Sequence, residues 1–152
     1  MLLLMIFSFF ILCQPIFALE KELIKEYKQI RSILEKDKFA ITDNYYFLFG
    51  SVTIEDFEDD LEFLAEASAY ENLEVYAFKK ICWPNYLDTE TKVEIFYQYL
   101  NTNPLFKENK NITVLKKQKR PNDVINIIFT FDRKNNIITF PSNQELGLIN
   151  TC

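Results

Sequence analysis

The feature that constrains the fold most is a long amphipathic pattern from Ser51 to Ile81. Its apolar residues recur at steps of three and four, which places them on one face of a helix. They are Phe57, Leu61, Leu64, Ala65, Ala69, Leu73, Tyr76, Ala77 and Ile81. Thr53 and Asp56 have the spacing of a capping box, and proline after Trp83 stops a helix. We therefore expect one helix over residues 51–81, with Thr53 as its N-cap.

The middle of this helix face carries small side chains, Ala65, Ala67, Ser68 and Ala69. Small residues let another element approach closely, as a sheet laid across the helix requires. Six acidic residues crowd the first turns, where the helix dipole favours them. They are Glu55, Asp56, Glu58, Asp59, Asp60 and Glu62. They lack the alternating ligands and the glycine of a calcium loop, so we expect a solvated face and no metal site.

Two further amphipathic segments predict helices. In residues 20–38, Leu23, Tyr27, Ile30 and Leu34 share a face, and the pattern leaves open whether this helix packs on the core or reaches a partner. After Pro84, an N-cap at Asp88 or Thr89 begins a helix that ends near Leu100. The residues on its packing face are Val93, Phe96, Tyr97 and Leu100.

Four segments have strand composition. Residues 45–49 are aromatic on both faces, which predicts a strand covered on both sides, and Gly50 is expected to turn the chain into the long helix. Later strands are expected over 112–115, 124–131 and 137–140. The turns between these strands are at residues 120–123 and 135–136, and the basic cluster Lys116, Lys117, Lys119 and Arg120 is expected at a hairpin tip.

The predicted element order gives an α+β fold: an antiparallel sheet of about four strands with the long amphipathic helix packed on one face, plus an N-terminal helix. We expect one domain over residues 19–152. Within it, residues 19–38 form the N-terminal helix, 45–140 the core and 141–152 an irregular tail that only Cys152 ties down.

Residues 1–18 have the composition of a secretory signal peptide. They hold a long apolar run, then Gln14-Pro15, then the small residue Ala18, after which we expect cleavage. This segment contains no Lys or Arg, so an uncleaved membrane anchor is the alternative. No small residue precedes Cys13 as a lipoprotein signal prefers, so we expect no lipidation. The expected location is therefore the periplasm or the medium.

Export would leave two cysteines, Cys82 and Cys152. An even pair in an oxidising compartment predicts a disulfide bond, with two free thiols as the alternative. In the chain-entropy model, closing a loop of this length contributes about 4 kcal/mol to stability. The bridge would join the tail to the end of the long helix.

The composition excludes several functions. The chain contains no histidine, which removes His-dependent nucleophilic sites and the commonest metal ligand. Its two glycines cannot form a phosphate-binding loop, and its net charge of −5 argues against nucleic acid. We therefore expect a non-enzymatic protein without a cofactor. A hydrolase with paired carboxylates, such as Asp59 and Asp60, is the remaining catalytic alternative.

Aromatic residues are abundant, with 15 Phe, 8 Tyr and 1 Trp. Four of them are candidates for binding a partner protein: Tyr45, Tyr46, Trp83 and Tyr86. The same side chains could instead stack on a sugar or hold a peptide. Ordinary core packing is the third interpretation.

The pattern also resembles a known family. An aromatic strand ends in Phe49-Gly50-Ser51, an acidic segment and an alanine-bearing helix follow, and later strands include Ile127-Ile128-Phe129. Between Tyr45 and Phe140 this resembles small envelope domains of Gram-negative bacteria, which include outer-membrane lipoproteins and periplasmic ring or disc components of the flagellar motor. The extra helix after Pro84 departs from their layout. The resemblance implies a structural role in an assembly, without catalysis.

The sequence therefore predicts an exported, non-enzymatic envelope protein that binds another envelope protein. A secreted domain or inhibitor that recognises sugar or peptide is the alternative. Contact with the membrane is expected only through residues 1–18, if they are not cleaved.

Overall fold

The computed structural model describes residues 2–54, 60–107 and 112–149, with side chains from Glu20 onward. Within these ranges it contains three helices and four strands. They are α1 (Leu2–Asp37), β1 (Phe39–Ile41), β2 (Tyr45–Thr53), α2 (Leu61–Lys80), α3 (Thr89–Thr102), β3 (Thr113–Lys119) and β4 (Val124–Asp132). The predicted α+β class and the N-terminal helix are confirmed.

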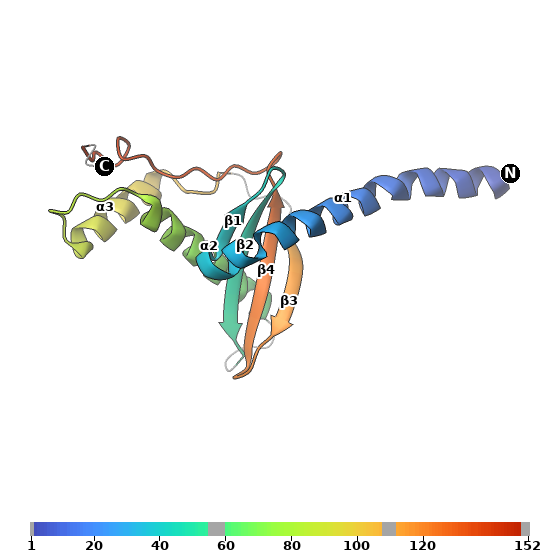
Figure 1. The fold of residues 1–152 in the computed structure, drawn as a ribbon, viewed down its shortest axis with the longest axis horizontal. Helices are drawn as coiled ribbons and strands as arrows, with labels where there is room; N and C mark the ends of the chain where they lie inside the picture. Colours follow the sequence, from blue (N-terminus) through green and yellow to red (C-terminus); the bar gives the residue numbers. More distant parts are fainter. Residues whose placement is uncertain (1, 55–59, 108–111, 150–152) are drawn as a thin grey trace.

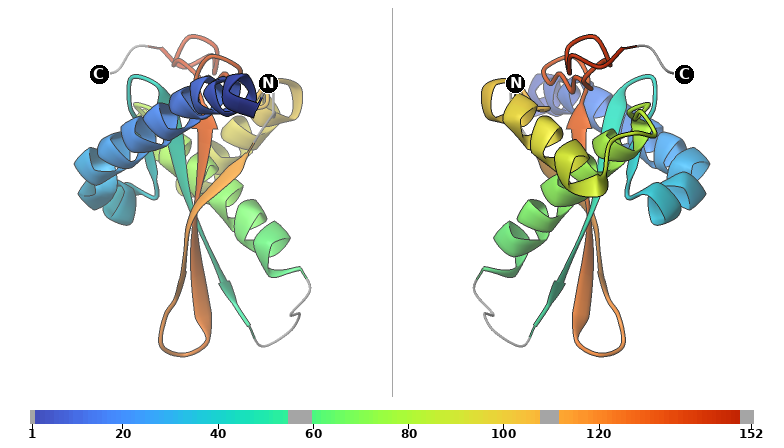
Figure 2. Two further views of the ribbon diagram at one scale, coloured as in Figure 1. Left: turned by 90° about the vertical axis from the view of Figure 1, so that its right-hand side faces the viewer. Right: turned by 90° about the vertical axis from the view of Figure 1, so that its left-hand side faces the viewer.

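The four strands form one antiparallel sheet in the order β1-β2-β4-β3. The two long strands β2 and β4 lie at its centre, where Gly50 is paired with Ile127. Strand β3 is an edge strand with a bulge between Val114 and Lys116. The C-terminal half of α1 lies on one face of the sheet and α2 crosses the other (Figures 1 and 2).

Alternation along β2 divides its side chains between these two faces. Tyr46 and Leu48 pack with α2 in the larger core. Tyr45, Phe47 and Phe49 point to the opposite face and pack with α1. The expectation that this strand is covered on both sides is confirmed.

The smaller core shows what the N-terminal helix does. Its buried residues are Ile30, Leu34, Ala40, Phe47 and Ile128, so α1 closes this face of the sheet. The N-terminal part of α1 continues as helix away from the sheet (Figure 1). The predicted signal segment belongs to this part, and its side chains lie outside those described.

Gly50 explains how α2 packs so closely. A Cβ atom at this position would lie 1.9 Å from the carbonyl oxygen of Ala65 and 3.2 Å from the Cβ of Ala69. Ala65, Ala69 and Ala77 are all buried against the sheet. The small residues of the helix therefore let it cross the sheet, as expected, but Gly50 continues β2 and does not form a turn.

The start of the long helix was predicted wrongly. Ser51, Val52 and Thr53 continue β2 and pair with residues 124–126 of β4, so Thr53 is not an N-cap. Helix α2 begins at Leu61 after Asp60, whose side chain makes no capping hydrogen bond. Asp56, the other half of the predicted capping box, lies outside the described residues. Pairing with β4 overrides the local helical pattern, since all three residues gain ladder partners.

The edges of the sheet also differ from expectation. The segment 137–140 forms only an isolated bridge between Ile138 and Phe106. The place beside β4 that this segment was expected to take is held by β2, and β1 forms the edge beyond β2. Three residues, Phe39–Ile41, are too short to give a strand pattern. Strand β3 extends to Lys119, so the basic cluster lies mostly along an edge strand rather than at a hairpin tip.

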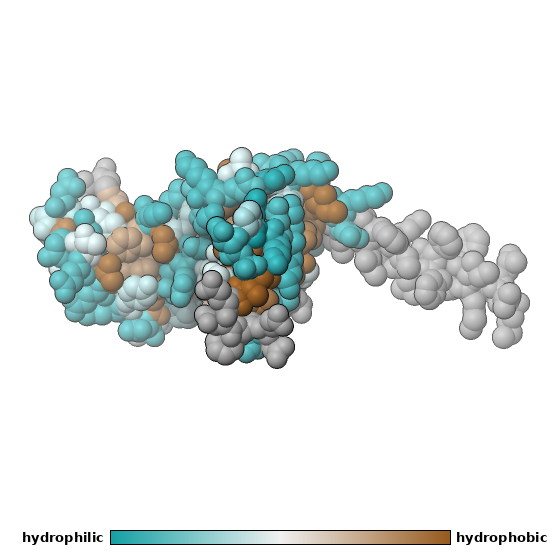
Figure 3. All heavy atoms as spheres, turned by 90° about the horizontal axis from the view of Figure 1, so that it is seen from below, coloured by the Kyte–Doolittle hydropathy of each residue, from teal (hydrophilic) through white to brown (hydrophobic). Residues whose placement is uncertain are grey.

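Helix α3 confirms its prediction. Asp88 is the N-cap, and its carboxylate accepts a hydrogen bond of 2.8 Å from the backbone N–H of Thr91. That bond holds the pKa of Asp88 below its usual 3.8. The helix lies beyond the C-terminal end of α2, at the far end of the molecule from the N-terminus (Figure 1). At the end of the molecule opposite the N-terminus, apolar side chains are exposed among polar ones (Figure 3, left).

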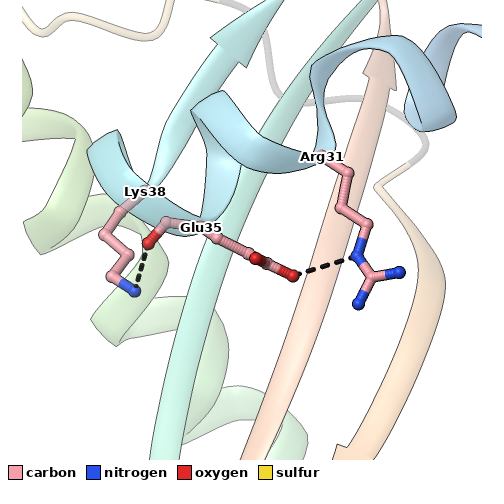
Figure 4. A network of polar contacts seen from close by, with 3 residues as sticks. All are labelled: Arg31, Glu35 and Lys38. Carbon is pink, nitrogen blue, oxygen red and sulfur yellow. Dashed lines mark hydrogen bonds and ion pairs between the residues drawn. The ribbon is translucent and has the colours of Figure 1, made fainter.

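The end of α1 is fixed by Lys38, which has a left-handed backbone (φ 62°). Its N–H donates to the carbonyl of Leu34 at 2.9 Å, as in a helix C-cap. Its ammonium donates to the carbonyl of Glu35 at 2.8 Å, while the Glu35 carboxylate pairs with Arg31 at 3.0 Å (Figure 4). The same ammonium lies 4.1 Å from the ring centre of Phe49, so one residue ends the helix and joins it to β2.

The tail is better anchored than the sequence indicated. Leu146 is buried in the larger core, and the amide of Asn143 donates to the backbone carbonyl of Cys82 at 2.6 Å. The expectation that only Cys152 holds the tail is therefore wrong. Apolar burial and side-chain hydrogen bonds hold residues 142–149 independently of any bridge.

Among the side chains that are described, no helix combines the length and the apolarity needed to cross a membrane.

Candidate protein-binding groove

An apolar groove lies where the C-terminal half of α2 meets α3. Val75 and Phe78 form its α2 side, and Val93, Phe96 and Tyr97 form its α3 side. The hollow measures about 280 Å³. We call this feature the α2–α3 groove.

The local sequence places these side chains. On α3, Val93, Phe96 and Tyr97 follow the spacing i, i+3, i+4, so they share one face. Phe96 is buried in the core, whereas Val93 is 39% exposed and Tyr97 50% exposed. The apolar face of α3 is therefore wider than the part that contacts the core. Its remaining side chains, Val93 and Tyr97, line the groove.

On α2, Val75 and Phe78 lie off the face that carries Ala69, Leu73 and Ala77. Val75 is 49% exposed. The apolar repeat in the sequence predicts the inner face of this helix but does not single out these two residues as functional candidates. The available signal was an apolar pair outside the main stripe.

A row of aromatic rings continues from the groove to the loop after α2. Trp83 lies 5.0 Å from Phe78 between ring centres, Phe78 lies 5.5 Å from Phe96, and Phe96 lies 5.7 Å from Tyr97. The Trp83 indole N–H donates to the carbonyl of Phe78 at 3.0 Å. Half-buried Trp83 therefore supports the floor of the groove through Phe78.

A carboxylate stands at the groove wall. Glu74 accepts a hydrogen bond from the Tyr97 hydroxyl. Burial raises the pKa of Glu74 above its usual 4.5, the Tyr97 hydrogen bond opposes this, and the negative charge of Glu71 adds to the rise. Glu74 is therefore a partly desolvated charge beside an apolar surface.

This raised pKa predicts a stability effect. At pH above the folded pKa, the ionised carboxylate is less favourable in the folded chain than in the unfolded one, and the penalty disappears below pH 4.5. We expect Glu74→Gln to unfold at a higher urea concentration than the wild type near neutral pH. The two midpoints should converge at pH below 4.5. A lower midpoint for the variant at neutral pH would contradict the effect of burial.

The four aromatic candidates do not form one surface. Trp83 and the 73% exposed Tyr86 belong to the segment between α2 and α3, and Trp83 contacts Phe78 of the α2–α3 groove. Tyr46 is only 7% exposed and stacks on Phe39 in the core, which removes its ring from any surface. Tyr45 lies on the opposite face of the sheet, in the smaller core.

Tyr45 borders a polar hollow of about 300 Å³ together with Glu22, Asn44, Asp132 and Lys134. Burial raises its pKa, and the negative charges of Glu22, Glu26 and Asp132 add to this. A larger hollow of about 400 Å³ lies on the other side of Glu22 and Asn44, between α1 and the β1–β2 turn. Both hollows are lined mainly by charged and polar side chains.

Glu26 holds this region together. It is 9% exposed, and its carboxylate accepts hydrogen bonds from the Thr42 hydroxyl and from the Asn44 amide, the latter at 2.6 Å. These bonds tie α1 to the β1–β2 turn. Since they satisfy the buried carboxylate, its role is structural.

Glu26→Ala should lower the free energy of unfolding by about 2 kcal/mol, because partly buried donors of Thr42 and Asn44 lose their acceptor. Urea denaturation followed by circular dichroism measures the loss. Glu22→Ala is the matched control, since Glu22 is exposed and accepts from Asn44 only at 3.4 Å. Its expected change is within about 0.5 kcal/mol. Equal losses in both variants would show that the Glu26 bonds add nothing.

The other sequence-based sites remain predictions. Cys82 lies at the end of α2, and its predicted partner Cys152 lies outside the described residues. Glu55, Asp56, Glu58 and Asp59 of the acidic segment also lie outside them. Within the described part of the chain, no group of three or more His, Cys, Asp or Glu residues could hold a metal ion.

Comparison with known proteins adds no relative. No protein-family model, no curated protein and no solved structure matches this chain. The resemblance to small envelope domains stays a prediction.

Proposed function

We propose that this chain is an exported, non-enzymatic protein of the bacterial envelope that binds another envelope protein through the α2–α3 groove. The observation that carries the proposal is the partly exposed apolar lining of the groove. Val75, Val93 and Tyr97 line the same hollow and are all partly exposed. Apolar and aromatic side chains gathered in a concave surface are typical of the centre of a protein interface.

The fold supports this proposal. The groove walls are two helices whose inner faces are buried, so the exposed side chains stand on rigid supports. Rigid anchors lose little conformational entropy when they bind. This arrangement supports a structural or protein-binding role.

Site-specific photocrosslinking in cells tests the groove. A photoreactive amino acid at Val93 or at Tyr97 should give one discrete crosslinked product. The control position is Lys36, which is exposed on α1, on the other face of the sheet. No product at the groove positions, or the same products at Lys36, would overturn the proposed function.

The proposed export to the envelope is tested separately. The intact mass of the protein from the envelope fraction is measured after alkylation, with and without prior reduction. We expect a species that begins at Leu19 and takes up alkylating agent only after reduction, because Cys82 and Cys152 would be paired. The hydrogen bond from Asn143 to the Cys82 carbonyl supports this pairing, since it already holds the tail beside the end of α2. A full-length, freely alkylated species would overturn both cleavage and bridge.

A further inference from the structure

The α2–α3 groove has a charge that points to the chemistry of its partner. Glu74 lines the groove among Val75, Phe78, Val93 and Tyr97. Its neighbour Glu71 is exposed and adds a second negative charge. The groove is therefore apolar with a negative charge at Glu74, strengthened by Glu71, and a positive charge at Lys79.

Glu74 forms no ion pair with a cation of the described chain. The ion pairs among the described residues join Arg31 to Glu35 and Lys119 to Asp123, far from the groove. Lys79 also lines the groove but forms no ion pair with Glu74. The Tyr97 hydroxyl donates one hydrogen bond, which leaves further acceptor capacity on the carboxylate.

We propose that the partner is a protein segment that inserts an apolar side chain between Val75 and Val93 and places a Lys or Arg beside Glu74. This inference depends on the proposed function and adds the partner's chemistry to it. A cation at that point would pair with a carboxylate that is already partly desolvated. Such a pair contributes more than one on an open surface, because part of the desolvation is already complete before binding.

The alternative occupants have weaker support. A segment with an acidic flank would face repulsion from Glu71 and Glu74. A purely apolar segment would leave the Glu74 carboxylate buried without a counter-charge, which costs binding free energy. A segment with an apolar side chain and a cation avoids both costs when the cation pairs with Glu74 and stays clear of the like charge of Lys79.

Selection from a random-peptide display library on the immobilised full chain tests the inference. We expect enrichment of peptides that carry Lys or Arg close to an apolar residue. Their affinity, measured by fluorescence anisotropy, should fall about tenfold in Glu74→Gln and further in Glu74→Lys, as for a partly buried charge pair. The matched control is Glu66→Gln, which removes a carboxylate from the same helix outside the groove lining and should leave affinity unchanged.

A second variant separates the two proposals. Val75→Asp changes an exposed groove residue, so folding should be retained while apolar insertion is lost. Two outcomes would overturn the charge inference and still leave the groove as a binding site. In the first, the peptides that no longer bind Val75→Asp contain no Lys or Arg. In the second, those peptides bind Glu74→Lys as tightly as the wild type. If no selected peptide depends on Val75, both the inference and the groove are overturned.

Discussion

Gly50→Ala is expected to destabilise this protein by about 3 kcal/mol, a large part of the roughly 5–15 kcal/mol by which a typical domain is stable. The new Cβ would lie 1.9 Å from the carbonyl oxygen and 2.8 Å from the carbonyl carbon of Ala65. Both are backbone atoms, so helix α2 itself must move away from the sheet. Replacing glycine also restricts the unfolded chain, but this gain is only about 0.4–1 kcal/mol and the clash outweighs it.

Urea denaturation of the full chain, followed by circular dichroism, measures this loss. Gly147→Ala is the matched control, because nothing lies within 4 Å of its new Cβ although its φ of +68° is strained for alanine. We expect the control to lose only about 1 kcal/mol. If Gly50→Ala is as stable as the control, α2 does not approach β2 as closely as the structure indicates.

Phe47→Ala is expected to cost about 3–5 kcal/mol, the range for removing a fully buried phenylalanine. Phe47 is 0% exposed and lies in the smaller core with Ile30 and Leu34 of α1. Its ring is 6.2 Å from that of Tyr27 on α1, measured between centres. The substitution would leave a cavity between the sheet and α1 and weaken the attachment of the helix.

Phe63→Ala provides the control for this variant. It removes the same side chain from a position on α2 that is 70% exposed, so the expected change is within about 0.5 kcal/mol. The same denaturation experiment serves both variants. Similar small losses in Phe47→Ala and Phe63→Ala would show that α1 does not form a packed layer on the sheet.

The elements that were predicted well have strong local signals. Helix α3 combines the Asp88 cap with a repeating apolar face, and β4 is β-branched or aromatic at every position except Asn126 and Asp132. The turn before β4 contains Asn122 and Asp123, which both have positive φ, as these residue types tolerate. Local physics and tertiary structure agree in these segments.

The errors occur where distant pairing overrides a local pattern. Residues 51–53 read as the start of a helix, but in the fold they pair with residues 124–126, more than seventy positions along the chain. The three-residue strand β1 exists because antiparallel pairing with β2 satisfies its backbone, which no local pattern reveals. The expected strand at 137–140 does not join the sheet, because β4 already pairs with β2 on one side and with β3 on the other.

The groove illustrates the same division. The sequence identified Trp83 and Tyr86 by their aromatic character, and Trp83 does support the groove floor. It did not single out Val75, whose only signal in the sequence is its position outside the main apolar stripe, because the packing of another helix decides whether such a valine stays half exposed. It also assigned no role to Glu74, whose pKa is raised because the fold partly buries its carboxylate.

The sequence by itself determined the α+β class, the inner face of α2, helix α3 and the central strands, because periodicity, caps and turn residues are local properties. Only the tertiary structure decided where β2 ends, which strand holds the edge, that α1 covers the second face, and that α2 and α3 leave a groove between them. Each of these depends on contacts between segments far apart in the chain, whose free energy exceeds the local preferences they override.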